Sequence, residues 1–268
     1  LAVEKDMDRL FATLEEWGIP GVKIDFMDRS DQWMVGYYER VMKCAARHRL
    51  FVDMHGSYTP KGLYRTYPNL LTYEGVLGME QGARCKPENS NWLPFIRNAV
   101  GPMDFTPGSM FSAQPEDNRS TGANPMGTGT RAYQMALYVV FESPLQMLAD
   151  NPVLYRREHP CTEFLAAVPT TWDSLRVLHA ACGREVVVAR RKGDKWYVGG
   201  ITNDRPYTTE IALDFLPAGR TFTMTSFEDG VNADLQATDY RKRVREVDAS
   251  TVVKVEMVRN GGWAAVIE

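Results

Sequence analysis

The 268-residue chain lacks the features that mark several common classes of protein. None of its apolar runs approaches the roughly 20 residues that cross a bilayer, so we expect no membrane span. Its net charge of −3 gives no broad basic field, which argues against nucleic acid as the main partner. Its four cysteines, Cys44, Cys85, Cys161 and Cys182, have no metal-type spacing, and we interpret them as free thiols.

The sequence also lacks the short motifs that identify several enzyme classes. It contains no G-x-S-x-G elbow, so a Ser-His-Asp triad has little support, and no G-x-G-x-x-G follows a predicted strand. It contains neither H-E-x-x-H nor C-x-x-C, so we expect no zinc site. The chain begins LAVEKDMDRL, without an initiator methionine or the pattern of a signal peptide, and we expect an upstream part.

What the chain does contain is typical of a globular protein with a sizeable core. Hydrophobic residues make up 44% of it and charged residues 24%, and its length suits one large or two ordinary domains. Over the first part, to about residue 165, helical patterns alternate with short apolar runs, which predicts a parallel sheet. The predicted helices cover 7–17, 33–49, 92–100 and 130–141, and the predicted strands cover 21–26, 50–55, 69–75, 102–105 and 144–150.

Polar side chains stand where the predicted strands end. They are Asp25, His55, Glu74, Asp104 and Asp150. In parallel α/β folds, and above all in (β/α)8 barrels, functional side chains gather at the carboxyl ends of strands. About five strand–helix units are present, short of the eight that close such a barrel. We therefore expect an α/β fold that is a partial (β/α)8 TIM-type barrel made of its later strands; an open sheet is the alternative.

The pattern changes at about residue 184, where period-2 strands replace the alternation of helices and strands. Two apolar runs surround Lys192, Gly193 and Asp194, which is a hairpin signal. Further short strands follow with turn residues between them, and this spacing predicts an all-β sandwich. We expect two domains, a catalytic barrel portion over 1–170 and a C-terminal antiparallel β-sandwich over 171–268.

Three acids near the strand ends are candidates for chemistry. Asp25 ends an early strand, and Glu74 and Glu80 flank the segment GVLGM just beyond a later one. Two carboxyl groups that face one sugar are the minimum equipment for glycoside hydrolysis, one as acid and the other as nucleophile or base. Each acid alone has an equally simple interpretation as a cap or an ion-pair partner. For Asp28 and Asp31 we expect only such a turn or capping role.

Lys23 and His55 are candidates for binding. Lys23 is two residues from Asp25, so both side chains point to the same face of the predicted strand, and we expect them to pair. Lys23 is either half of a structural ion pair or a donor to a substrate hydroxyl, and we favour the donor. His55 is either a histidine satisfied by a neighbouring group or a substrate contact.

Several long blocks of the sequence resemble glycoside hydrolase family 97. Among them are GVKIDFMDRSDQWMVGYYERV, LFVDMHGSYTPKGLYRTYPNLLTYEGVLGMEQ, GPMDFTPGSM, ALYVVFESPLQMLADNP and VVARRKGDKWYVGGITN. The family combines an N-terminal β-sandwich, a catalytic (β/α)8 barrel and a C-terminal β-sheet domain. The resemblance covers essentially the whole chain and implies the later barrel strands followed by the C-terminal domain, without the N-terminal sandwich and the first strands.

The resemblance also implies catalytic roles. In the family's inverting α-glucosidases a glutamate base follows the histidine of the fifth strand, and here that position is Gly56. In the retaining branch, which includes α-galactosidases, an aspartate nucleophile ends the fourth strand, and here that position is Asp25. Glu80 matches the general acid/base of both branches. Two positions, Asp25 and Gly56, therefore point to retention.

Further positions match binding residues of the family. Glu74 matches a ligand of the calcium ion (Ca2+) that the family holds near its site. His55 and Lys23 match sugar-contacting positions, and Arg65 is a weaker candidate for the same task.

The enzyme that the resemblance implies is a retaining α-galactosidase. It would act through a covalent glycosyl-enzyme intermediate on an oligosaccharide or a small α-galactoside. An α-glucosidase of the same family, a non-catalytic carbohydrate-binding fragment and an unrelated barrel lyase or isomerase are the alternatives. The absent N-terminal portion of the same enzyme is a further expected partner. By analogy with such enzymes, we expect a periplasmic or extracellular location in a bacterium.

Overall fold

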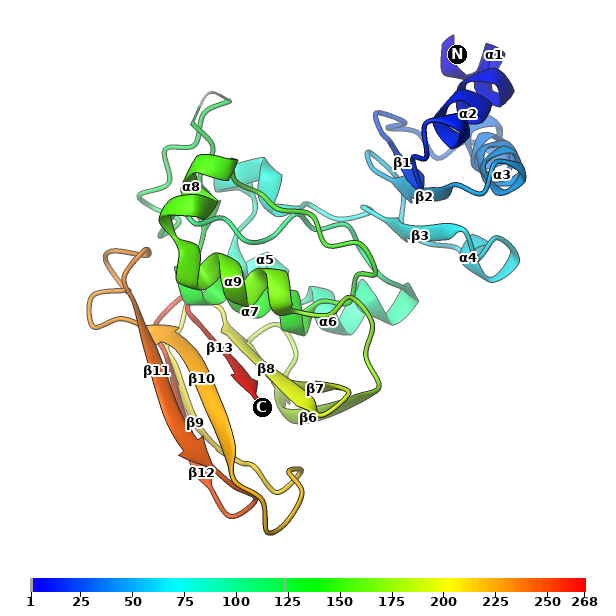
Figure 1. The fold of residues 1–268 in the computed structure, drawn as a ribbon. Coiled ribbons are helices and arrows are strands. Elements are labelled where there is room, and N and C mark those ends of the chain that lie inside the picture. Colours follow the sequence, from blue (N-terminus) through cyan, green and yellow to red (C-terminus); the bar gives the residue numbers. More distant parts are fainter. Residues whose placement is uncertain (1, 123) are drawn as a thin grey trace.

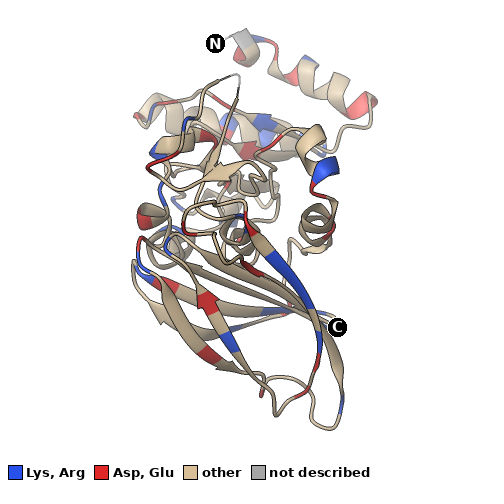
Figure 2. Ribbon diagram, turned by 90° about the vertical axis from the view of Figure 1, so that its left-hand side faces the viewer, with Lys and Arg blue, Asp and Glu red and all other residues tan. Residues whose placement is uncertain are grey.

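A computed structural model of the chain describes residues 2–122 and 124–268. Figure 1 shows an N-terminal portion of helices and short strands, a central helical portion and a C-terminal portion of long strands. Acidic and basic residues are distributed over all three portions (Figure 2), which agrees with the small net charge. Within the part of the chain that is described, no helix has the length and apolar character needed to cross a membrane.

The N-terminal portion is a three-stranded parallel sheet with helices beside it. Its strands lie in the order β1, β2, β3, and the register pairs Lys23 with Asp53 and Met54 with Tyr73. The parallel sheet predicted from the alternation of helices and strands is thereby confirmed. The elements are α1 (Ala2–Lys5), α2 (Met7–Glu16), β1 (Gly21–Ile24), α3 (Gln32–Arg47), β2 (Phe51–Met54), α4 (Leu63–Thr66) and β3 (Leu70–Tyr73).

Helix α3 shows why these residues form these elements. Asp31 caps its first turn, because the Asp31 carboxylate accepts a hydrogen bond from the Met34 N–H, as we expected of that residue. Tyr38, Val41 and Met42 repeat at helical spacing on one face and are completely buried. They pack with Phe11 of α2 and with side chains of β1 and β2 in one hydrophobic core. This core holds the carboxyl ends of the strands in place.

The central portion departs from the prediction in two places. The predicted strand at 102–105 is reduced to a single parallel bridge between Met103 and Tyr73. The predicted strand at 144–150 is irregular, and Asp150 does not end a strand; its carboxylate accepts hydrogen bonds from the Phe111 N–H (2.9 Å) and the Ser109 hydroxyl (3.3 Å). Those bonds keep the loop before it in shape, so Asp150 has a structural role.

The remaining elements of the central portion are mostly short. The helix predicted at 92–100 is divided into an α-helical and a 3-10 segment, whereas the helix predicted at 130–141 is confirmed. The elements are η1 (Met79–Arg84), α5 (Pro87–Ser90), α6 (Leu93–Ile96), η2 (Asn98–Val100), β4 (Ser112–Ala113), β5 (Gly127–Thr128), α7 (Arg131–Val140), α8 (Pro152–Arg157) and α9 (His159–Ala167).

The C-terminal portion is built from two antiparallel sheets. Six strands lie in the order β11, β10, β13, β8, β7, β6, and β12 pairs with β9 separately. The hairpin predicted around Gly193 joins β7 to β8. The strands are β6 (Ser174–Ala181), β7 (Glu185–Lys192), β8 (Lys195–Thr202), β9 (Tyr207–Ala212), β10 (Phe222–Asp229), β11 (Tyr240–Val247), β12 (Val252–Met257) and β13 (Gly262–Ile267).

The inner strands of the six-stranded sheet, β10, β13, β8 and β7, are covered on both faces. One face packs with β9 and β12 around a core that includes Val198, Ile211 and Val255. The other face packs on α7 and α9, where Tyr197 and Phe227 meet Phe164. Every residue of α7 is buried, so this helix joins the strand-rich portion to the rest of the molecule.

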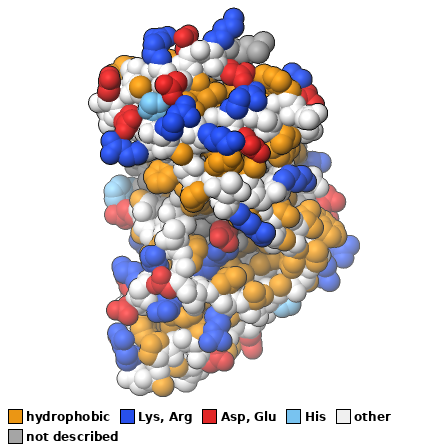
Figure 3. Space-filling view, turned by 90° about the vertical axis from the view of Figure 1, so that its right-hand side faces the viewer, with side chains coloured by type: hydrophobic (Ala, Val, Ile, Leu, Met, Phe, Trp, Pro, Cys, Tyr) orange, Lys and Arg blue, Asp and Glu red, His pale blue; other side chains and the backbone are white. Residues whose placement is uncertain are grey.

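All four cysteines are free thiols, as the sequence predicted, and only Cys182 is exposed. The surface is not uniformly polar. In the view of Figure 3, hydrophobic side chains interrupt the charged ones over much of the face shown.

Candidate active site

The carboxyl ends of the three parallel strands carry the candidate residues. Asp25 directly follows β1, His55 directly follows β2, and Glu74 directly follows β3. Glu80 lies in the first turn of η1. Parallel strands end at the same edge of a sheet, so these side chains emerge on one side of the N-terminal portion.

His55 is the centre of this group. Its side chain is buried, with Nδ1 lying 2.9 Å from Oδ2 of Asp104 and Nε2 lying 2.9 Å from Oε1 of Glu80. Oε1 of Glu74 lies 3.4 Å from the same Nε2. Glu74 and Glu80 therefore both approach Nε2 of His55. Asp104 holds the imidazole ring through Nδ1.

Burial and hydrogen bonding have opposite effects on the pKa of His55. Burial favours the neutral ring and lowers its pKa, but the hydrogen bonds to Asp104 and Glu80 outweigh it and raise the pKa of His55 to about 9. Burial would likewise raise the pKa of Asp104, but hydrogen bonds from His55 and Lys23 hold it below its usual value. The Asp104 carboxylate thus favours the protonated form of His55.

Lys23 does not pair with Asp25, which corrects the expectation from the sequence. Its Nζ lies 2.6 Å from Oδ2 of Asp104 and 3.9 Å from Oδ2 of Asp53. The alternation of side chains applies only inside a strand, and β1 ends at Ile24, before Asp25. Asp53 is the register partner of Lys23 on β2, so the pairing runs across the strands.

The side-chain carboxylate of Asp25 lies close to the backbone of Gly56. A Cβ atom built on Gly56 would lie 2.9 Å from Oδ1 of Asp25 and 2.9 Å from the backbone nitrogen of Phe26. The Gly56 N–H in turn donates to Oε2 of Glu74 at 2.8 Å. Gly56 therefore joins the Asp25 carboxylate to the group formed by His55, Glu74 and Glu80.

The segment after Asp25 has an unusual backbone. Phe26 and Asp28 both have positive φ angles, of 61° and 44°, which only glycine adopts without strain. The Phe26 N–H donates to Oδ1 of Asp25 at 2.6 Å, and the Asp28 N–H donates to the Gly56 carbonyl at 2.8 Å. These bonds turn the chain sharply and hold the Asp25 carboxylate beside Gly56. Asp28 thus has the turn role that the sequence predicted.

Two hollows open beside these residues. One, of about 550 Å³, is lined by Asp25, Phe26, Trp33 and other side chains of β1 and α3. The other, of about 320 Å³, is lined by Gly56, Glu74 and neighbouring loop residues. An aromatic ring beside a carboxylate suits the apolar face and the hydroxyls of a sugar.

Arg65 is not brought into this group by any contact of the described residues. It lies on α4, which leads into the amino end of β3, and its guanidinium is 5.9 Å from the ring centre of Tyr64. The structure instead adds Asp104, which the sequence offered only as a polar residue at a strand end, and Asp53, which lies inside β2. Both stand in or after an apolar run, as Asp25 does.

His55, Glu74 and Glu80 are also the residues here that could hold a metal ion. One donor atom from each lies within 4.8 Å of the others. Burial raises the pKa of Glu74, and the neighbouring Glu80 carboxylate raises it further, so a cation would relieve the repulsion. The two carboxylates suit an oxygen-preferring ion such as Ca2+, and the imidazole nitrogen does not.

Two models of one protein family match the chain. The model described as "Glycoside hydrolase 97" matches residues 1–76, and the model described as "Glycosyl-hydrolase 97 C-terminal, oligomerisation" matches residues 171–268.

Two curated relatives match over nearly the whole chain. A retaining alpha-galactosidase of Bacteroides thetaiotaomicron is 42% identical over 272 aligned residues, which cover 100% of this chain and 41% of the relative. A probable retaining alpha-galactosidase of Streptomyces bingchenggensis is 34% identical, with 99% of this chain and 39% of the relative covered. The chain therefore spans about two fifths of the length of these relatives.

Solved structures of similar proteins have the same fold. A glycoside hydrolase family 97 enzyme from Pseudoalteromonas sp. strain K8, an E480Q variant in complex with panose, superposes with a TM-score of 0.88 at 33% identity. The alignment covers 99% of this chain and 44% of that enzyme. A beta-arabinopyranosidase superposes with a TM-score of 0.80 at 28% identity, over 97% of this chain and 41% of its own. These matches extend the likeness from the sequence to the arrangement of helices and of the C-terminal β portion.

Proposed function

The chain belongs to glycoside hydrolase family 97, and we propose that it carries the catalytic residues of a retaining α-galactosidase. One structural observation supports this function more than any other. The Asp25 carboxylate lies against Gly56, whose N–H binds Glu74, and Glu74 shares the His55 imidazole with Glu80. A nucleophile and an acid thus belong to one connected group at the strand ends.

The proposed reaction is a double displacement at the anomeric carbon of an α-galactoside. Asp25 attacks this carbon, while Glu80 in its protonated form donates its proton to the departing glycosidic oxygen. The covalent ester between the sugar and Asp25 is then hydrolysed by water, from which Glu80 now removes a proton. Each step transfers one proton to or from Glu80, so the residue returns to its first state after one turnover.

The neighbours of the two acids have positioning roles in this proposal. His55 holds Glu80 through Nε2, and Asp104 holds the His55 ring through Nδ1, so the acid keeps one orientation. Lys23 is 30% exposed, and we assign its free N–H groups to a hydroxyl of the sugar. We keep Arg65 as a candidate for the same task only at a more distant part of the substrate.

Glu74 would hold a calcium ion in this proposal, while Glu80 stays free for proton transfer. The Glu74 carboxylate supplies oxygen ligands, and the Gly56 N–H fixes one of its oxygens in place. When bound, the ion would supply a fixed positive charge beside the reacting sugar. The residues of the chain carry out the proton transfer and the nucleophilic attack themselves.

We also propose that β1, β2 and β3 are consecutive strands of a (β/α)8 barrel. The bridge from Tyr73 to Met103 continues the same parallel series. β1 is the edge strand of the described sheet, and Trp17, Ile19 and Phe26 near its two ends are exposed. Such an edge pairs readily with another strand. We propose that the strand that pairs with the β1 edge belongs to the N-terminal part that the longer relatives have.

An α-glucosidase is the second candidate function. The observation that favours it is the similar family 97 enzyme whose structure holds panose, an oligosaccharide of glucose. Galactose and glucose differ only in the configuration of one hydroxyl. The greater identity to a retaining alpha-galactosidase, 42% against 33%, favours the galactoside.

The experiment compares hydrolysis of p-nitrophenyl α-galactoside and α-glucoside. It uses this chain alone and this chain fused behind the N-terminal part of the Bacteroides relative, which we refer to as the fused protein. We expect the fused protein to hydrolyse the galactoside, the Asp25→Gly variant to lose this activity, and azide to restore part of it. The matched control is Asp194→Gly, which changes an aspartate in the β7–β8 hairpin. Preferential cleavage of the glucoside, or full activity of Asp25→Gly, would refute the proposal.

A further inference from the structure

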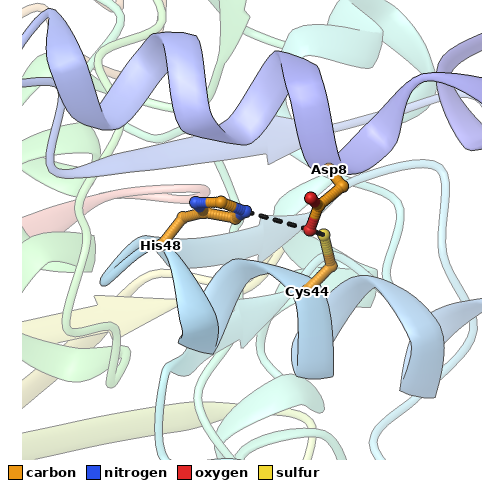
Figure 4. Close-up of side chains that lie close together, drawn as sticks. All are labelled: Asp8, Cys44 and His48. Carbon is orange, nitrogen blue, oxygen red and sulfur yellow. Dashed lines mark hydrogen bonds and ion pairs between the residues drawn. The ribbon is translucent and has the colours of Figure 1, made fainter.

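Three side chains from two helices converge at a place far from the strand ends. Asp8 lies on α2, and Cys44 on α3 and His48 directly after it face Asp8 (Figure 4). Oδ1 of Asp8 lies 3.6 Å from Sγ of Cys44 and 3.1 Å from Nε2 of His48. One carboxylate oxygen, one sulfur and one imidazole nitrogen lie within 4.8 Å of one another.

The separations of these atoms match the edges of a tetrahedral zinc site. With zinc–ligand distances of about 2.0 Å for oxygen and nitrogen and about 2.3 Å for sulfur, a tetrahedron separates sulfur from oxygen by about 3.5 Å and nitrogen from oxygen by about 3.3 Å. The corresponding distances here are 3.6 Å and 3.1 Å. Two of the three edges therefore match within about 0.2 Å, and the third, from Sγ of Cys44 to Nε2 of His48, is no longer than 4.8 Å.

The surroundings of His48 also fit a metal ligand. Its second nitrogen, Nδ1, lies 3.2 Å from Oε2 of Glu15 on α2. Histidines that bind metals through one nitrogen usually donate the N–H of the other to a carboxylate, which fixes the tautomer and orients the ring. Glu15 is itself held by Arg49, whose Nη2 lies 2.8 Å from Oε1 of Glu15.

The three ligands differ in exposure in a way that permits entry of an ion. Cys44 is buried, so its sulfur faces the cluster from the protein interior. The Asp8 side chain is 70% exposed, so water has access to the cluster at Asp8. Water can therefore supply the fourth ligand.

Arg47 is the competitor of a metal ion at this place. Its Nη2 lies 2.8 Å from Oδ1 of Asp8, the same oxygen that faces Cys44 and His48. The simpler interpretation of the cluster is an ion-pair clamp between α2 and the end of α3. The Arg47 side chain is 61% exposed and can move into solvent, so it opposes binding without blocking it. This competition gives a way to separate the two interpretations.

We propose that Asp8, Cys44 and His48 bind a zinc ion that joins α2 to α3. The mixed sulfur, nitrogen and oxygen set suits Zn2+ and not an oxygen-preferring cation such as Ca2+. This site is separate from the proposed catalytic group and independent of the proposed function. It also revises our expectation of no zinc site, because ligands from two helices leave no motif of fixed spacing in the sequence.

The test is titration of the purified chain with Co2+, as a spectroscopic probe, and with Zn2+. We expect a near-ultraviolet thiolate-to-cobalt charge-transfer band that Zn2+ abolishes by displacement. Cys44→Ser should remove the band and Cys182→Ser, at an exposed cysteine elsewhere, should leave it unchanged. Glu74→Gln reports on the separate His55, Glu74 and Glu80 cluster, and it should leave the band unchanged as well.

Two variants distinguish a metal site from an ion-pair clamp. Arg47→Gln removes the competing cation and should tighten Zn2+ binding several-fold. If the cluster is only an ion-pair clamp, the same variant should weaken the link between α2 and α3 without any gain in Zn2+ binding. Glu15→Gln should weaken binding by about tenfold, as loss of a carboxylate behind a metal-bound histidine does. Circular dichroism checks that each variant is folded. Absence of a Cys44-dependent band in the folded chain, or weaker Zn2+ binding by Arg47→Gln, would overturn the proposal.

Discussion

The Cβ atom that Gly56 lacks would lie 2.9 Å from Oδ1 of Asp25. Real Cβ atoms do not approach other atoms so closely, so a side chain at position 56 would require the Asp25 carboxylate and the adjoining Phe26 backbone to shift. The resemblance to family 97 implies a glutamate at this position in the inverting branch. The contact between Gly56 and Asp25 gives a steric reason why a glutamate here would displace the Asp25 carboxylate.

Replacing Gly56 tests this relationship. Gly56→Ala should lower α-galactosidase turnover by the fused protein at least about tenfold, because the Asp25 carboxylate must move. Gly62→Ala is the matched control, since Gly62 also has a positive φ, of 92°, and nothing lies within 4 Å of its absent Cβ. Both variants should lose about 1 kcal/mol of stability from backbone strain. Equal turnover by the two variants would contradict the steric explanation.

The buried ion pairs of Asp104 should be important for stability. Asp104 accepts from both Lys23 and His55, and Asp104→Asn would leave these two cations without their main partner. We expect a loss of about 3 kcal/mol in the free energy of unfolding, measured with urea. Glu256→Gln, which breaks the exposed pair with Lys254, should cost less than about 1 kcal/mol. A loss below about 1 kcal/mol for Asp104→Asn would mean that Asp53 replaces it fully.

Asp229 should make stability depend on pH. Burial raises the pKa of Asp229 from its ordinary value of 3.8 to about 7, against the effect of hydrogen bonds from Thr130, Val258 and Gly262. The folded state therefore favours the protonated acid. Its stabilising contribution is complete below about pH 4 and is lost as the pH rises through about 7, with a total change of about 4 kcal/mol.

Asp229→Asn separates this effect from other titrations. An asparagine resembles the protonated acid, because its oxygen can accept from the Val258 and Gly262 N–H groups and its NH2 can face the Thr130 hydroxyl. Urea unfolding at about pH 4 and about pH 8 should therefore show a smaller loss of stability with rising pH in the variant. Parallel pH profiles for the two proteins would show that Asp229 stays ionised throughout.

Two adjacent glycines of β8 should respond differently to substitution. A Cβ on Gly199 would lie 2.8 Å from Cβ of Val139 and 2.9 Å from the Ala136 carbonyl oxygen, both on α7. A Cβ on Gly200 would lie 3.3 Å from the flexible Met257 sulfur. Thermal unfolding should therefore show a loss of about 1–3 kcal/mol for Gly199→Ala and a change below about 1 kcal/mol for Gly200→Ala. Similar losses in both would mean that α7 can move away from the sheet.

The elements that the sequence predicted are those with buried apolar patterns. Helices α3 and α7 and the hairpin of β7 and β8 were found where their periodicity indicated. β6 lies before residue 184, where the strand pattern becomes recognisable, and β11 has no clear alternation, because the outward side chains of both strands hide the pattern. Leu175 and Val177 of β6 are apolar yet more than half exposed, and β11 carries a run of basic residues. Exposure of this kind depends on neighbours in space, which the sequence does not contain.

The sequence predicted some members of the candidate group at the strand ends, but neither the part played by Asp53 nor the pairings. Asp25, His55, Glu74 and Glu80 were identified from strand ends and from the family resemblance. The partner of Lys23 was wrong, because the register that sets Asp53 beside it is a property of the folded sheet. The importance of Gly56 as empty space beside Asp25 likewise becomes visible only in three dimensions.

The most direct test of the proposed mechanism is to trap the sugar on its nucleophile. The fused protein is treated with a fluorinated α-galactosyl fluoride that forms the glycosyl-enzyme quickly and releases it slowly, and the labelled peptide is identified by mass spectrometry. A double displacement through Asp25 predicts one fluorinated galactosyl label, carried by Asp25 and absent from the Asp25→Gly variant. A label on another residue, or turnover of substrate without any covalent adduct, would contradict it.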